Sequence, residues 1–312
     1  MLKSILLSIC ICNIAFGYYF NTQWDMRNPP TLEQSLESLL QIDCQQVEFL
    51  KGIGSKSQYK GEKAIAHCLI EQKLIKAIIE DDTHTYTLLK ANEQCCAYFL
   101  FYTTQTPRFI ITPLMAAIVF NASKVFELIL ADSDKSDMFS TKKPFYDINR
   151  VISDIYIPLR AFKLGDSIYD VHGVSALDLS AMYHRYSMFW ALLKKGAEYN
   201  NPKYPLTNGI ITFGDIYILE LMLHFDESFL YRFAGGKILH IAARDGNVAL
   251  LEYLITHKHL PVDSLKSGQT PLDWALNTKN QKPQLQSAKK LIELGAKVSQ
   301  ANRNRLNKLN SK

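Results

Sequence analysis

Two groups of residues in this 312-residue chain are of types that bind metal ions. His257 and His259 lie two residues apart, a spacing at which both imidazoles could reach one ion. The segment 132–137 holds three aspartates, which calcium sites use as ligands. An EF-hand loop also needs glycine at its sixth position and glutamate at its twelfth, where this chain has Asp137 and Lys143. We therefore expect no metal site, and interpret the histidines as an exposed loop pair and the aspartates as a solvated loop.

The sequence has no motif typical of a catalytic site: no His-Glu-x-x-His, no Cys-x-x-Cys, no Gly-x-Ser-x-Gly and no glycine fingerprint after a strand. The segment 51–63 is rich in Gly, Lys and Ser, but it lacks the spacing of a phosphate-binding loop, so we interpret it as a solvated linker. We expect no enzymatic activity and no cofactor. One alternative is a small catalytic or toxin-like N-terminal domain, in which Cys95 or Cys96 would need a histidine base within reach. The candidate bases are His67 and His84.

Composition and charge bound the class of protein. With 47% apolar and 21% charged residues, the chain is neither disordered nor collagen-like. Residues 297–312 carry five basic and no acidic side chains, which accounts for the whole net charge of +5. The rest of the chain is neutral in sum and offers no basic surface for phosphates, so we expect no nucleic-acid partner.

Residues 1–17 have the layout of a secretory signal peptide. Lys3 precedes an apolar run, and Ala15 and Gly17 place small side chains three and one positions before a cleavage point. The run is shorter than the ~20 residues that span a bilayer, although an uncleaved anchor and a buried first helix stay open as alternatives. We predict cleavage after Gly17, a secreted or periplasmic location, and no membrane span in the mature chain.

Cysteines are confined to the first part of the chain. After the predicted signal peptide, four remain: Cys44, Cys68, Cys95 and Cys96. Because adjacent cysteines rarely bond each other, we expect any disulfide to link one of the adjacent pair to Cys44 or Cys68. The alternative is that all four are small buried apolar side chains on helices.

Residues 18–105 are predicted to form a small helical region. Thr31 and Gln34 have the spacing of a capping box, which predicts a helix that starts there and continues to Gly52. A second amphipathic run over 69–79 predicts another helix.

From residue 112 onward the sequence repeats itself. Similar hexapeptides begin at Thr112, Ser175, Lys237 and Thr270, and the last two starts are 33 residues apart. A further step of 33 back from Lys237 reaches Tyr204, where Pro and Leu follow as in the other units. Self-similarity with this period is the signature of a repeat array, in which each unit buries its apolar face on its neighbours.

These units resemble the ankyrin repeat, whose pattern is Thr-Pro-Leu-His, two alanines, a turn glycine, a Val-x-x-Leu-Leu helix and Gly-Ala. The unit at 170–197 fits without a gap, and Asn121 takes the turn glycine's place in the unit at 112. The resemblance implies an all-α fold: an ankyrin-type helical-hairpin solenoid over 106–298 with five to six units, preceded by the small helical region. Within it, 131–170 is an eroded repeat or an excursion, and His240 is expected to be a hydrogen-bonded structural histidine.

The resemblance also implies a monomeric protein that binds another protein through its concave face. Family contact positions fall on Phe109, Ile111, Val119, Phe120, Val171, His172, Val174, Met182, Tyr183, Arg244, Asp245, Lys266, Ser267 and Gln269. Several of these side chains are apolar or aromatic, which suits a protein-binding patch. The alternative is that Val119 and Phe120 pack under the 131–170 segment.

Two further functions stay open at the level of sequence. The chain could be a microbial effector that acts in a host cytoplasm, with the basic polar tail 299–312 as a secretion or docking segment. It could also be an ankyrin scaffold that directs a catalytic N-terminal domain to its target. For the tail itself, a frayed terminus is the simpler interpretation.

Overall fold

The computed structural model describes most of the helical parts of the chain. The described residues are 31–41, 43–46, 49–51, 58–91, 111–132, 161–164, 167–170, 174–199, 215–232, 237–277 and 284–310. The predicted signal peptide, residues 1–17, lies outside them. The chain forms two compact units, Met1–Ala176 and Leu177–Lys312.

The first unit begins with helix α2 (Leu32–Glu37), which carries the predicted capping box between Thr31 and Gln34. The expected continuation of this helix to Gly52 is wrong. The chain instead passes through two 3₁₀ segments, η1 (Ser38–Gln41) and η2 (Cys44–Gln46), into strand β1 (Phe49–Lys51). Local hydrogen bonds compete with the helix here, because the Asp43 carboxylate accepts the N–H of Gln45.

Strand β1 pairs in antiparallel fashion with β2 (Gln58–Lys60), so that Leu50 lies opposite Tyr59. The described ends of the segment 51–63 therefore belong to a β-ribbon and to the start of the next helix, which corrects the prediction of a plain linker. That helix, α3 (Glu62–Ile79), confirms the amphipathic run at 69–79. It is followed by α4 (Thr83–Ala91).

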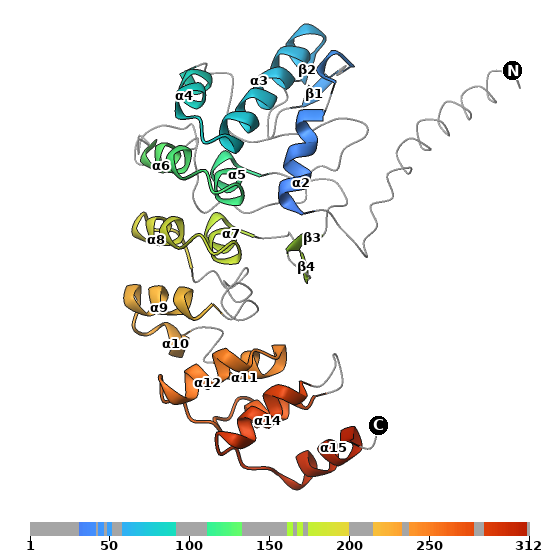
Figure 1. The fold of residues 1–312 in the computed structure, drawn as a ribbon, viewed down its shortest axis with the longest axis vertical. Helices are drawn as coiled ribbons and strands as arrows, with labels where there is room; N and C mark the ends of the chain where they lie inside the picture. The colour runs from blue at the N-terminus through green and yellow to red at the C-terminus, as the bar shows by residue number, and fades with distance from the viewer. Residues whose placement is uncertain are drawn as a thin grey trace, which may run out of the picture. The chain divides into compact units, whose positions relative to one another are not determined.

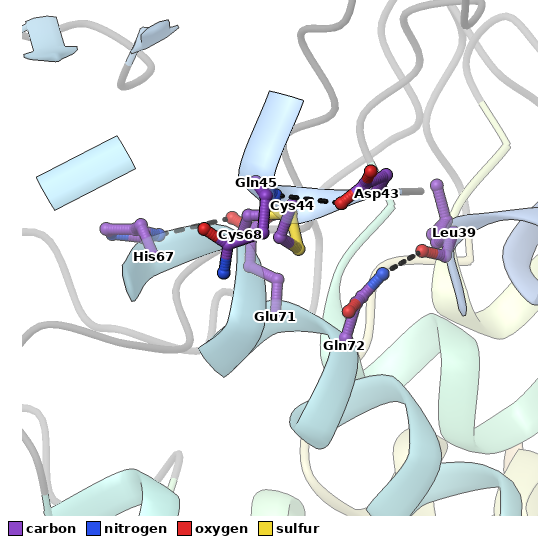
Figure 2. Close-up of a disulfide and its surroundings, with 8 residues drawn as sticks. All are labelled: Leu39, Asp43, Cys44, Gln45, His67, Cys68, Glu71 and Gln72. Atoms are coloured by element: carbon purple, nitrogen blue, oxygen red, sulfur yellow. Dashed lines mark hydrogen bonds and ion pairs between the residues drawn. A yellow bond between two sulfur atoms is a disulfide. The ribbon is translucent and has the colours of Figure 1, made fainter. Parts of the chain in front are cut away.

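A disulfide joins Cys44 of η2 to Cys68 of α3 (Figure 2). The predicted pairing of either residue with Cys95 or Cys96 is thus wrong in this structure. The segment η2 lies against α3, which brings the two Cα atoms to 5.7 Å, within the range that a disulfide requires. Close by, the side-chain amide of Gln72 donates to the carbonyl of Leu39 at 2.9 Å and ties η1 to the same helix.

The rest of the first unit is a helix pair and a β-hairpin (Figure 1). Helix α5 (Pro113–Val119) starts at Thr112, whose hydroxyl accepts the N–H of Met115, and α6 (Ser123–Asp132) follows. Helix α5 packs on α3, and Lys90 of α4 pairs with Asp132 of α6. In the predicted 131–170 excursion, strands β3 (Ala161–Leu164) and β4 (Ser167–Asp170) form an antiparallel hairpin.

The named elements of the second unit are all helices in its described residues. Its elements are α7 (Ala176–Met182), α8 (Tyr186–Lys194), α9 (Ile216–Phe225), α10 (Phe229–Arg232), α11 (Ile238–Asp245), α12 (Val248–Thr256), α13 (Pro271–Ala275), α14 (Leu285–Glu293) and α15 (Gln300–Asn310). The predicted first helix of the unit at 204 lies outside the described residues. The predicted all-α class with helical-hairpin repeats is confirmed. The polar tail at 299–312 includes helix α15, which corrects the interpretation of a frayed end.

Four helix pairs turn in the same way. In each pair, a residue one or two positions after the end of the first helix has a positive φ. The values are 51° at Asp81, 57° at Asn121, 54° at His184 and 84° at Gly246. The N–H of the next residue then bonds to a carbonyl five positions earlier: Asp82 to Ala77, Ala122 to Ala117, Arg185 to Ser180 and Asn247 to Ala242. This left-handed closure ends each first helix. The prediction that Asn121 replaces a turn glycine is confirmed, and the pair α3–α4 shares the geometry.

The turn residue also touches the start of the next second helix. Asp81 accepts the N–H of Val125 at 2.9 Å, at the first turn of α6. His184 Nδ1 lies 2.6 Å from Asp215 Oδ2, and Asp215 caps α9 through the N–H of Ile218. The side chains of Asp81 and His184 thereby join successive pairs at two of the four turns.

Candidate protein-binding surface

Several of the predicted contact side chains are buried. Ile111 is 0% exposed, Val119 1%, Met182 3%, Tyr183 7% and Val174 8%. Helix α5 is apolar on every side and all seven of its residues are buried, so it has no exposed stripe to offer a partner. These five side chains belong to the core of this structure, which corrects their assignment as surface contacts. Phe120 is half-buried, while Phe109, Val171 and His172 lie outside the described residues.

The remaining predicted contacts gather around α11, α13 and the turn before α13. Lys266 and Gln269 exchange two backbone hydrogen bonds of 2.9 and 3.0 Å, and Ser267 and Gly268 between them have φ of 52° and 76°. Positive φ at both central residues is the geometry of a tight two-residue hairpin. Ser267, Gly268 and Gln269 are exposed, so this hairpin tip is available for contact.

His240 holds the hairpin tip on helix α11. The imidazole is fully buried, and its Nε2 donates to the carbonyl of Gln269 at 3.1 Å. Burial lowers the pKa of His240 below its ordinary value, against the raising effect of its backbone hydrogen bonds, so the neutral form is favoured. This confirms the prediction of a hydrogen-bonded structural histidine.

Trp274 of α13 is the centre of this surface, and the sequence reasoning did not select it. Its ring centroid lies 5.4 Å from that of His240 in an edge-on arrangement, and the Arg244 guanidinium lies 6.0 Å from the Trp274 centroid. Arg244 is held by two hydrogen bonds to Asp245, of 2.6 and 3.0 Å. Trp274 stands at the variable position of the ankyrin pattern, where the preceding unit has Ile241, and the matching alanine is Ala275, so the pattern gave no reason to select it. We call Arg244, Asp245, Lys266, Ser267, Gln269 and Trp274 the Trp274 surface.

Helix α15 is anchored beside this surface through Asp273. One carboxylate oxygen accepts from the N–H and hydroxyl of Thr270, at 2.8 and 2.9 Å, and the other accepts from Asn302 at 3.0 Å. Burial raises the pKa of Asp273, but these hydrogen bonds and the charge of Arg305 outweigh it and lower the pKa below its ordinary value. The carboxylates of Asp245 and Asp273 are therefore both engaged within the chain.

The described residues gather no group of three or more His, Cys, Asp and Glu side chains that could hold a metal ion. His257 stacks on Tyr253, with ring centroids 5.1 Å apart, and His259 has a φ of 54°. His67, one of the proposed bases, lies 3.5 Å from the Glu71 carboxylate (Figure 2). Its proposed nucleophiles, Cys95 and Cys96, lie outside the described residues.

The Trp274 surface carries residue types that are common in protein-binding sites. Tryptophan and arginine are the residue types that most often dominate protein interfaces, and the exposed turn beside them adds backbone polar groups.

Across the helices that the structure describes, none has the length and apolar character needed to cross a membrane.

The described helices form pairs that repeat along the chain, which is the architecture of a helical repeat protein. Residues 210–302 match a family model described as ankyrin repeats, three copies, so this part of the chain consists of ankyrin repeats. They make a module of the kind that mediates protein–protein contacts. A search of curated protein sequences gives no match.

Two solved structures are similar to this chain at low sequence identity. The ankyrin repeat domain of human ASB11 is 15% identical, with 73% of this chain and 85% of that chain covered and a TM-score of 0.46. The second is a chain from the complex of the predatory endopeptidase Bd0816 of Bdellovibrio bacteriovorus with the immunity protein Bd3460. It is 19% identical, with 71% of this chain and 97% of that chain covered and a TM-score of 0.46.

Proposed function

We propose that this chain is a non-catalytic, exported protein that captures a partner protein through the Trp274 surface. The observation that carries this is the placement of Trp274 and Arg244 beside an exposed hairpin tip on ankyrin repeats. A half-buried indole needs little further burial to become an anchor, and a guanidinium already fixed by Asp245 loses little side-chain entropy on binding.

Export is supported by the disulfide together with the sequence of residues 1–17. Disulfides persist in oxidising compartments and are rare in the cytosol, where thiols are kept reduced. The Cys44–Cys68 bond therefore favours a secreted or periplasmic protein over the alternative of an effector in a host cytoplasm. The same bond holds η2 against α3 within residues 18–105, the region in which the alternative of an ankyrin scaffold places a catalytic domain.

A monomeric state is part of the proposal. Helix α15 follows the last ankyrin pair, and most of its described side chains are polar and exposed. A polar outer element is the usual end of a repeat array, because it closes the apolar surface of the last unit.

The test compares capture by the full chain with capture by two variants. Arg244→Gln keeps most of the side-chain volume and Trp274→Ala removes the anchor, whereas Leu88→Ala changes an exposed side chain of α4 and serves as the control. The proposal expects one protein that the wild type and Leu88→Ala capture equally and both surface variants lose, with unchanged melting for Arg244→Gln. Equal capture by all four forms would remove the Trp274 surface as the binding site.

A further inference from the structure

A second surface stands out by its exposed aromatic side chains. Nine large hydrophobic side chains are exposed among the described residues, and the four aromatic ones all lie between α8 and α10. They are Tyr186 at 37%, Tyr217 at 57%, Phe225 at 40% and Tyr231 at 74% exposure. The other five are leucine or isoleucine and are scattered along the chain.

Most of these rings form one continuous face with their neighbours. Tyr186 and Trp190 are one turn apart on α8; Tyr186 contacts Tyr217 of α9 with centroids 4.7 Å apart, and Trp190 contacts Phe225 at 6.2 Å. Two further rings complete it, since His224 lies 5.6 Å from Trp190 and Tyr199 lies 5.8 Å from Phe225. We call Tyr186, Trp190, Tyr199, Tyr217, His224 and Phe225 the aromatic face.

The repeat fold does not require this aromatic face. Helices α8 and α9 are the second helices of their pairs, and the corresponding helices α6 and α14 expose mostly polar side chains: Lys124 and Glu127 on α6, and Gln286, Lys289 and Glu293 on α14. Rings at these positions expose apolar area that water disfavours. An exposed aromatic cluster with polar surroundings is typical of a contact site.

Three acidic side chains near the aromatic face are engaged within the chain, while Glu198 and Glu227 are exposed. Asp215 is bound to His184, Asp226 accepts the hydroxyl of Tyr199 at 3.0 Å, and Glu220 pairs with Lys258 at 2.6 Å. These contacts leave the carboxylates little freedom to meet a cationic partner.

Three basic side chains lie at the two ends of α8, and two of them, Arg185 and Lys195, also make contacts within the chain. Lys194 lies with its ammonium 5.9 Å from the Trp190 centroid and has no carboxylate partner in the part of the chain that the structure describes. Lys195 follows it, and the Arg185 guanidinium lies 5.9 Å from the Tyr183 ring at the other end of the helix. A partner at this face therefore meets aromatic rings bordered by positive charge.

We propose that the aromatic face on α8 and α9 is a second docking surface, which takes a protein segment that presents apolar side chains flanked by carboxylates. Apolar groups of the partner cover Tyr186, Trp190, Tyr217 and Phe225, while a carboxylate of the partner meets Lys194. The proposal rests on the proposed binding role, but the face lies on second helices, apart from the Trp274 surface.

The test uses the indole N–H signals of the full chain in ¹⁵N nuclear magnetic resonance spectra. The chain has three tryptophans, Trp24, Trp190 and Trp274, so single Trp→Phe variants assign every signal. The probes are three synthetic amphipathic helices with one common Leu/Phe face and Glu, Gln or Lys on the other face. The Glu probe is expected to shift the Trp190 signal and to bind about tenfold more tightly than the Lys probe at low salt.

Two variants locate the binding. Tyr217→Ala is expected to weaken the Glu probe about tenfold, since an exposed aromatic anchor is lost without a change in the core. Ile292→Ala, which truncates an exposed apolar side chain of α14, is expected to leave the affinity unchanged.

Three results would overturn the inference: equal affinity for Glu and Lys probes, no effect of Tyr217→Ala, or binding only to phosphatidylglycerol vesicles. A shift of Trp274 alone would also overturn it while leaving the proposed function in place.

Discussion

The buried imidazole of His240 makes the stability of the fold depend on pH. Burial is the largest influence on its pKa and lowers it, so the folded protein binds the imidazole proton less readily than the unfolded chain does. The sign follows: the contribution to stability is complete above the unfolded pKa of about 6.5 and is lost as the pH falls through the lower folded value.

We therefore expect the free energy of unfolding to decrease as the pH is lowered below about 6.5. His240→Gln keeps a side-chain N–H near Gln269 but cannot take up a proton, so it should be less stable at pH 8 and show a shallower decrease. Urea unfolding of both proteins across this range measures the two slopes. Parallel curves would show that another group causes the acid sensitivity.

Gly246 ends helix α11 in a left-handed conformation that few other residues adopt without strain. Its φ of 84° is left-handed, and a Cβ atom there would lie 2.7 Å from the Gln284 side-chain oxygen. Gly295, with a φ of 95° and open space around it, provides the matched control. We expect Gly295→Ala to cost about 1 kcal/mol of stability through backbone strain alone, and Gly246→Ala to cost more because Gln284 must also move. Thermal melting compares them, and equal losses would show that Gln284 moves without cost.

The roles of single residues could be predicted from the sequence where they depend on neighbouring residues, as in helix caps and turns. Thr31 and Gln34 form the capping box that their spacing predicts, and Asn121 adopts the left-handed turn. The burial of Met182 and Tyr183 was not predictable, because it depends on what packs over the end of α7 and not on the repeat pattern.

At the scale of elements, the disulfide fixes the start of the first unit. It closes a loop with a sequence separation of 24, which joins α2 and the 3₁₀ segments to helix α3. We expect the double variant Cys44→Ala, Cys68→Ala to lose about 3 kcal/mol of stability, as loop-closure entropy predicts for a loop of this length.

Two measurements check that prediction. Thermal melting with and without reductant should show the same loss in the wild type and no effect of reductant in the double variant. Peptide mapping without reduction should recover Cys44 linked to Cys68. Recovery of Cys44 linked to Cys95 or Cys96 would contradict the structure.

Element types followed the sequence where periodicity was long and clear, as in α3. The prediction of one helix from Thr31 to Gly52 was wrong because apolar spacing alone does not register the turn at Asp43 or the pairing of β1 with β2. The hairpin pairs Lys51 with Gln58 and Phe49 with Lys60, and a search for helical spacing alone does not test for such a pairing.

At the scale of the whole molecule, the period of 33 residues was the strongest sequence signal, and it predicted the helical repeat class. The candidate site was predicted only in part. Arg244 and the tip at 266–269 were selected from the repeat pattern, whereas Trp274 occupies a variable position of that pattern and was missed. A surface residue is specified by its partner, which the fold does not encode.

Site-specific photo-crosslinking of the full chain tests whether the Trp274 surface binds a partner protein. A photoreactive amino acid replaces Gln269 at the tip of the Trp274 surface, and in a parallel sample it replaces the exposed Gln286 on α14 as the control. The account predicts one protein crosslinked through position 269 and absent from the sample with position 286. Crosslinks at 286 alone, or the same products from both positions, would contradict it.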